Sequence, residues 1–141
     1  MIMTTPKPIA ALLRAPAFGP VARAVLTTPY WFAGFYKLAH LPDALGEAAH
    51  FGLRPAGLVV AATIAVQLGG SALLILGRLS WLAAGALGVF TALATLIAHA
   101  FWTLPDPVER FHALNTFLEH IGLIGGLMLA AILVERERRT A

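Results

Sequence analysis

The feature that most constrains this chain is the stretch from Pro55 to Pro105, in which Arg78 is the only charged residue. The apolar runs on either side of it, residues 56–77 and 79–104, would each form a helix of roughly 33 to 39 Å at about 1.5 Å per residue. Both helices are long enough to cross a hydrocarbon core of about 30 Å. We predict two membrane-spanning helices joined by a short turn.

The composition also indicates a membrane protein. Hydrophobic residues make up 59% of the 141 residues and charged residues 12%, whereas soluble domains carry about 25% charged residues. The chain has no cysteine, which excludes disulfides, thiolate metal ligands and dithiol redox chemistry. Its basic residues, which give a net charge of +3, are spread along the chain. We therefore expect them to contact membrane lipid headgroups, and we expect no nucleic-acid partner.

Two further apolar segments flank the central pair. The first, residues 21–38, carries charge only near its ends and contains Pro29, which is expected to kink the helix. The second, residues 113–134, holds Glu119 and His120 among apolar residues. Together the four segments predict an all-α fold, a transmembrane four-helix bundle.

The expected organisation is one membrane domain with a short segment at each end. Prolines near the start of the chain break up its first apolar patch and leave at most a short interfacial segment. The expected parts are an N-terminal cytoplasmic or interfacial segment at 1–17, a membrane domain at 18–135 with spans at about 20–39, 56–77, 79–101 and 113–134, and a basic cytoplasmic tail at 136–141.

An even number of spans places both termini and the Arg78 turn on one side of the membrane. That side collects most of the lysines and arginines, so the positive-inside rule predicts cytoplasmic termini and a multi-pass protein of the bacterial inner membrane. The two loops on the other side are expected at about 39–54 and 102–112. The first loop is long enough for a short helix or a lid.

Small residues recur on one face of each predicted span. Gly122 and Gly126 form a GxxxG pair, which lets helix backbones approach closely in lipid. Glu119 lies on the same face and is therefore expected to point into the bundle. The glycines expected to pack between helices are Gly34, Gly70, Gly88, Gly122 and Gly126.

Polar side chains are predicted to gather in the exported half of the membrane. Lys37 and Glu119 form the expected ion pair, because a carboxylate in a low-dielectric setting is costly unless a cation lies beside it. The alternative is that both side chains reach the aqueous interface separately. Gln67 is the deepest strongly polar residue, and a hydrogen bond within the bundle is favoured for it over a ligand contact. The candidate pocket residues are Lys37, His40, Gln67, His99, Glu119 and His120.

The histidines among these candidates allow two chemistries. Imidazoles can ligate a haem or a metal ion, or they can donate hydrogen bonds to a quinone carbonyl. No pair of ligands on one helix has metal-binding spacing, and the neighbours Glu119 and His120 diverge by about 100°. Quinone is therefore the favoured ligand over haem or a metal ion, and no metal-binding residues are assigned. Separate interfacial histidines are the remaining alternative.

Three motifs together resemble one family. They are GFYKL at 34–38, QLGGSALLILG at 67–77 and FLEHIGLIGG at 117–126. The set is similar to the motifs of the DoxX family of small four-helix membrane proteins. Lys37 matches the family pattern, whereas Gln67 stands where the family often has glutamate and His120 stands where it often has asparagine.

The resemblance implies a link to quinone chemistry. The DoxX family is associated with thiosulfate:quinone oxidoreduction, and some members resemble membrane partners of oxidoreductases. The predicted function is thus a membrane subunit or partner of an oxidoreductase, with a polar, quinone-binding pocket in the outer half of the bundle. The alternative is a non-enzymatic membrane scaffold or assembly factor. The sequence leaves open whether the chain forms a homodimer and whether it has catalytic activity, which would be that of a quinone-linked oxidoreductase subunit.

Overall fold

The computed structural model describes residues 5–140, and their regular structure is entirely helical. This confirms the all-α prediction. In the first half of the chain the helices are α1 (Lys7–Leu13), α2 (Phe18–Leu26), α3 (Thr28–Ala39) and α4 (Leu41–His50). In the second half they are α5 (Ala56–Ile64), the π-helical turn η1 (Ala65–Gly69), α6 (Gly70–Ile75), α7 (Ser80–Ala98), the 3-10 turn η2 (Phe101–Thr103) and α8 (Pro107–Thr140).

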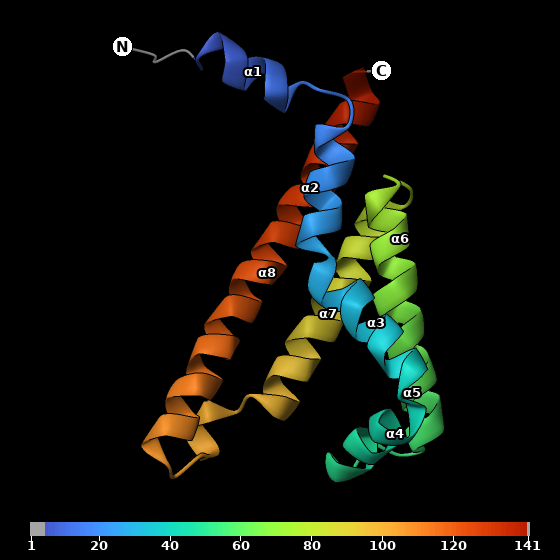
Figure 1. Cartoon of the computed structure of the whole chain (residues 1–141), viewed down its shortest axis with the longest axis vertical. Helices are drawn as coiled ribbons and strands as arrows, with labels where there is room; N and C mark the ends of the chain where they lie inside the picture. The colour runs from blue at the N-terminus through green and yellow to red at the C-terminus, as the bar shows by residue number, and fades with distance from the viewer. Residues whose placement is uncertain (1–4, 141) are drawn as a thin grey trace.

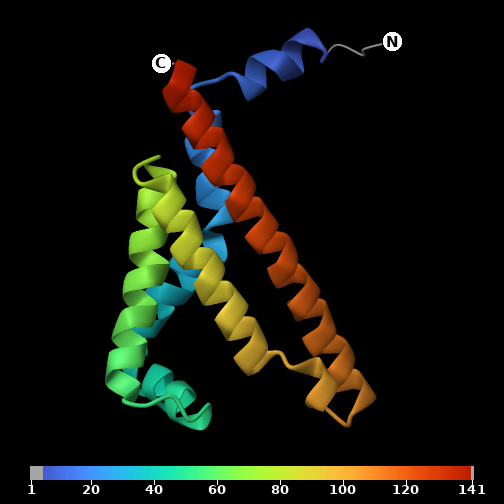
Figure 2. The same ribbon diagram turned by 180° about the vertical axis from the view of Figure 1, so that it is seen from behind.

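The helices run between two ends of an elongated molecule. α1, the end of α8 and the turn between α6 and α7 lie at one end, which we call the terminal end (Figure 1). α4 and the loop between α7 and α8 lie at the opposite end, which we call the α4 end (Figure 1). Seen from behind, α7 runs between the α5–α6 rod and α8, and α8 moves away from that rod toward the α4 end (Figure 2). α1 and the end of α8 therefore lie toward the same end as the Arg78 turn, the arrangement expected for an even number of spans.

Three helical segments are long and apolar enough to cross a membrane. They are Ala56–Ile75, Ser80–Thr103 and Pro107–Arg139. The chain is thus a multi-pass membrane protein. The predicted fourth span, at 20–39, is instead two helices, α2 and α3, which meet at Thr27. α1 precedes them at an angle of 69° to α2.

The break between α2 and α3 follows from Pro29, which lies in the first turn of α3 and has no backbone N–H. Side chains donate to a backbone carbonyl beside this break. The hydroxyl of Thr28 and the indole Nε1 of Trp31 each donate to the carbonyl oxygen of Ala24, at 3.1 Å. Such substitution by side chains is what permits a broken helix in an apolar medium.

The turn after α6 is a Schellman motif. Gly77 adopts the left-handed conformation (φ 67°), the N–H of Arg78 donates to the oxygen of Leu73 at 2.9 Å, and the N–H of Gly77 donates to the oxygen of Leu74 at 3.1 Å. Glycine suits this position because it has no Cβ to clash in that conformation. The chain can therefore reverse sharply here and enter α7.

Two arginines bind the carbonyl groups at the end of α6. Nε and Nη2 of Arg23 donate to the oxygen of Ile75 at 3.3 and 3.2 Å, and Nη2 of Arg138 donates to the oxygen of Gly77 at 3.0 Å. Positive charge is favourable at a helix C-terminus, where backbone carbonyls lack amide donors. These contacts join α2, α6 and α8 at the terminal end.

The main core lies midway along the molecule, where α3, α6, α7 and α8 meet. Its most buried members are Leu74, Leu87 and Leu127, each at most 1% exposed. A smaller cluster packs α4 on α5 through Ala44, Ala48 and Val60. The short helix or lid expected in the first exported loop is therefore present as α4.

The glycines differ in how closely neighbouring helices approach them. A Cβ added at Gly34 would lie 2.7 Å from two atoms of Leu68, and one added at Gly126 would lie 2.8 Å from a methyl group of Leu26. A Cβ added at Gly70 would likewise lie 2.9 Å from a side-chain atom of Leu87. Gly88 and Gly122 have no such neighbour: among the described residues of the chain, an added Cβ would meet no atom within 4 Å at either.

Gln67 lies in η1 and is 4% exposed. Its backbone oxygen accepts a hydrogen bond from the Ser71 hydroxyl at 2.6 Å, but its side-chain Oε1 has no partner among the described residues. The expected hydrogen bond within the bundle is therefore missing at this oxygen. A buried acceptor without a donor lowers stability, because it loses its hydrogen bond to water and forms none within the protein.

Replacing Gly34 with alanine should destabilise the fold. The new methyl group would overlap Leu68, and overpacking of this kind typically costs about 1 to 3 kcal/mol. Gly122→Ala is the matched control, since its methyl group meets open space and should leave stability unchanged or slightly higher. Reversible unfolding of both variants in mixed micelles measures the difference. Equal losses of stability would contradict the close approach at Gly34.

Replacing Gln67 with methionine should stabilise the fold. Methionine keeps the shape of the side chain but removes the unpartnered oxygen, whose burial costs about 1 to 3 kcal/mol. Gln67→Glu should have the opposite effect, because it places an ionisable group in the same apolar site. The same unfolding assay compares the two. A loss of stability in Gln67→Met would mean that the oxygen has a stabilising partner.

Candidate functional site

Lys37 lies in the last turn of α3, where a cation is favourable, and is half-buried. Its Nζ lies 3.5 Å from a carboxylate oxygen of Glu47 on α4. The expected ion pair between Lys37 and Glu119 is therefore wrong. Glu119 is exposed on α8, which packs chiefly on α7, η2 and α2 rather than on α3 or α4.

The Lys37–Glu47 pair lines a cavity of about 310 Å³ between α3, α4, α5 and α7, which we call the α4 cavity. These two are the only charged residues among the described residues that line it. The remaining walls are almost entirely apolar, and Ala44 and Ala48 of α4 cover one side. The cavity thus combines one ion pair with an otherwise hydrophobic surface, the usual character of a small-molecule site.

A second, more open space adjoins this cavity along α5 and α7. We call it the α5–α7 groove, and it has a volume of about 620 Å³. Groove and cavity share Val59, Thr63, Phe90 and Leu93, so the two spaces lie side by side. The groove reaches Trp81, in the first turn of α7 near the terminal end. All of the described residues that line it are uncharged.

His99 and His120 come together on α7 and α8. Their ring centroids are 5.2 Å apart and the rings are nearly perpendicular, at 77°. The Nδ1 of His120 lies 2.6 Å from the hydroxyl of Thr95, which donates its single hydrogen to the oxygen of Thr91. Nδ1 of His120 is therefore the donor in this contact, and the second ring nitrogen of a neutral imidazole remains an acceptor.

The predicted cluster is thus divided between two places. Lys37 lines the α4 cavity, whereas His99 and His120 meet outside it, between α7 and α8. His40 is exposed. Its Nδ1 is hydrogen-bonded to the backbone oxygen of Tyr36 at 3.0 Å, and its ring stacks on the Tyr36 ring. Within residues 5–140 no group of three or more His, Asp or Glu side chains is arranged to hold a metal ion.

Sequence reasoning missed one polar residue of the site and one polar contact of the core. Glu47 lies in the segment interpreted as a loop, although the alanines at 44 and 48 and the acid at 47 form the amphipathic pattern of a short helix. Tyr30 and Thr91 form a buried hydrogen bond of 2.5 Å between α3 and α7, next to the apolar core. Helical spacing places each residue on a polar face of its own helix, but it does not identify the two as partners.

Comparison with known proteins agrees with the motifs. The family model described as DoxX matches residues 20–100, which is more than half of the chain and includes Lys37, Gln67 and most of the residues that line the α4 cavity and the groove. The match ends before α8, so the resemblance at 117–126 lies outside it. No curated protein and no solved structure matches the sequence. The chain belongs to the DoxX family.

Proposed function

We propose that this protein binds a quinone, with the headgroup in the α4 cavity and the tail in the α5–α7 groove, and that it serves as the membrane partner of an oxidoreductase. One observation carries the proposal: a cavity lined by a single ion pair lies beside an uncharged groove along the membrane-spanning helices. A quinone has the same division into a polar ring and a long apolar tail.

The chemistry of Lys37 suits the ring. An ammonium group has three hydrogens to donate, and the carboxylate of Glu47 engages only one side of it at 3.5 Å. A quinone carbonyl can accept one of the remaining hydrogens. Because Glu47 already neutralises Lys37, an uncharged acceptor fits better than a fatty-acid carboxylate, which would bring a second negative charge beside Glu47.

The groove suits the tail. Its walls come from α5, η1 and α7, with Phe90 at the junction with the cavity and Trp81 at the far end. Val59 and Leu93 line both spaces, so the boundary between them is apolar. An isoprenoid chain buried there gains hydrophobic stabilisation without desolvating any charge.

The remaining parts of the proposal concern the setting of the protein. The lysines and arginines at the terminal end support cytoplasmic termini in a bacterial inner membrane, with α2 and α3 together as a fourth span. The α4 cavity then lies on the exported side. A chain without cysteine cannot carry sulfur as a persulfide, so a donor of that kind would be held by the partner oxidoreductase.

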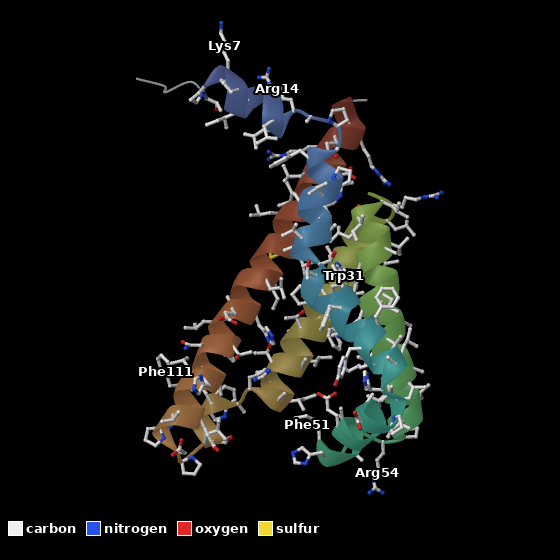
Figure 3. The ribbon with its side chains drawn as sticks, in the orientation of Figure 1. Lys7, Arg14, Trp31, Phe51, Arg54 and Phe111 are labelled. Carbon is white, nitrogen blue, oxygen red and sulfur yellow. The ribbon has the colours of Figure 1, made fainter. Side chains whose placement is uncertain are left out.

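Quinone binding to the purified protein in nanodiscs tests the site. Decylubiquinone should bind saturably, and Lys37→Met should weaken it at least about tenfold, because one hydrogen bond to a charged group contributes about 1.5 to 3 kcal/mol. Lys7→Met is the control, since Lys7 is exposed on α1, far from the cavity (Figure 3). Absence of saturable binding, or equal affinity in both variants, would refute the proposal.

A second pair of variants tests the groove. Gly85 lines it and has open space around its Cβ position, so Gly85→Leu should fill part of the groove without disturbing the fold. We expect this variant to weaken decylubiquinone more than a quinone without a tail. Gly122→Leu, also at an open position but on α8, should change neither affinity. If Gly85→Leu lowered the affinity for both quinones equally, the tail would not lie in the groove.

Recovery of a partner protein, compared with quinone binding, distinguishes the proposed function from the alternative of a scaffold or assembly factor. Purification in mild detergent should recover an oxidoreductase in a fixed ratio, and the Lys37→Met variant should still recover it. A stoichiometric partner without any quinone binding by the chain would favour the scaffold or assembly role instead.

A further inference from the structure

We infer that the terminal end carries a separate site for an anionic phospholipid, in the space between α2, α8 and the linker after α1. We call this space the terminal groove. It has a volume of about 850 Å³, larger than the α4 cavity. It shares no lining residue with the proposed quinone site, so the two proposals stand or fall independently.

The wall along α8 is apolar and open. Leu129 and Leu133 are 62% and 56% exposed, and Leu26 of α2 lies opposite them beside Gly126. Leu129 and Leu133 belong to the apolar, membrane-spanning part of α8. A hydrocarbon chain is the occupant that such a wall takes in a bilayer.

The other end of the terminal groove is cationic. Arg14 ends α1, is exposed, and has no side-chain hydrogen bond or ion pair within the described chain. Arg23 lies deeper, with its side chain 11% exposed, and its guanidinium is already engaged by the oxygen of Ile75 and by Glu137 at 3.7 Å. Arg14 is therefore the group available to a ligand.

The charge of the lining matches a singly charged headgroup. Arg14 and Arg23 contribute two positive charges and Glu137 one negative charge, which leaves a net charge of +1. The carboxylate of Glu137 would repel an anion, but it is held by Arg23 on the α8 side. A phosphodiester such as that of phosphatidylglycerol carries the one negative charge that Arg14 leaves uncompensated.

The position of α1 explains why the ligand is a lipid rather than a free phosphate. The 69° bend carries α1 across the end of the molecule, and Lys7 extends away from the helices (Figure 3). Ile9, Leu12 and Leu13 of α1 are exposed, as expected for a helix that lies at the membrane interface. Arg14 follows this helix and lines the terminal groove together with leucines that a free phosphate would not use.

Native mass spectrometry of the full chain in mild detergent tests this site. Dioleoyl phosphatidylglycerol should be retained in preference to dioleoyl phosphatidylcholine, which has the same chains. Arg14→Gln should lower the preference about fivefold, the effect of one basic residue on an anionic lipid. Arg54→Gln is the control, because Arg54 is exposed at the α4 end (Figure 3) and should leave the preference intact.

Two further experiments test whether the ligand is a lipid. Leu129→Trp, at an exposed position, should narrow the terminal groove and reduce phosphatidylglycerol retention without changing any charge. Glycerol phosphate, which has no acyl chain, should not displace the lipid at matched concentration. Equal retention of both lipids, equal effects of Arg14→Gln and Arg54→Gln, or displacement by glycerol phosphate would overturn the inference.

Discussion

A proline inside a lipid-embedded helix removes an amide donor, and hydrocarbon offers no water to the carbonyl that loses it. In this protein Pro29 removes the donor to the Val25 carbonyl midway along the first predicted span, and the side chains of Thr28 and Trp31 donate to the neighbouring carbonyl of Ala24. The break lets α2 pack on α6 and α8 while α3 turns toward α5 and η1. Lys37 therefore reaches the space under α4 rather than the histidines on α7 and α8. The α4 cavity, with its single ion pair, depends on this change of direction.

Features that depend on local periodicity were predictable from the sequence. The charge-free runs around Arg78 become antiparallel helices, and the Schellman turn at Gly77 brings them back beside each other. The depth of each residue along its helix was also predictable, which is why His99 and His120 meet as expected from neighbouring antiparallel helices. Depth follows from counting residues at a fixed rise, so it survives small errors in helix orientation.

Features that depend on rotation about a helix axis were not predictable. Lys37 and Glu119 were predicted at similar depth, but α3 follows the break at Thr27, and Lys37 pairs with the carboxylate of Glu47 on α4. Gly122 and Gly126 share one helix face, yet only Gly126 has a helix opposite it, because α2 covers α8 only near the terminal end. Residue spacing defines a face and leaves undetermined what lies across from it.

The attachment of α4 has a consequence for how the molecule moves. This helix is held by two small buried residues, Ala44 and Ala48, and by one ion pair in which Glu47 is 56% exposed, whereas the long rods share a core of large buried side chains. From these few contacts we expect α4 to have a lower local stability than the long helices. A ligand of the α4 cavity would then enter from this end without any rearrangement of the membrane-spanning helices.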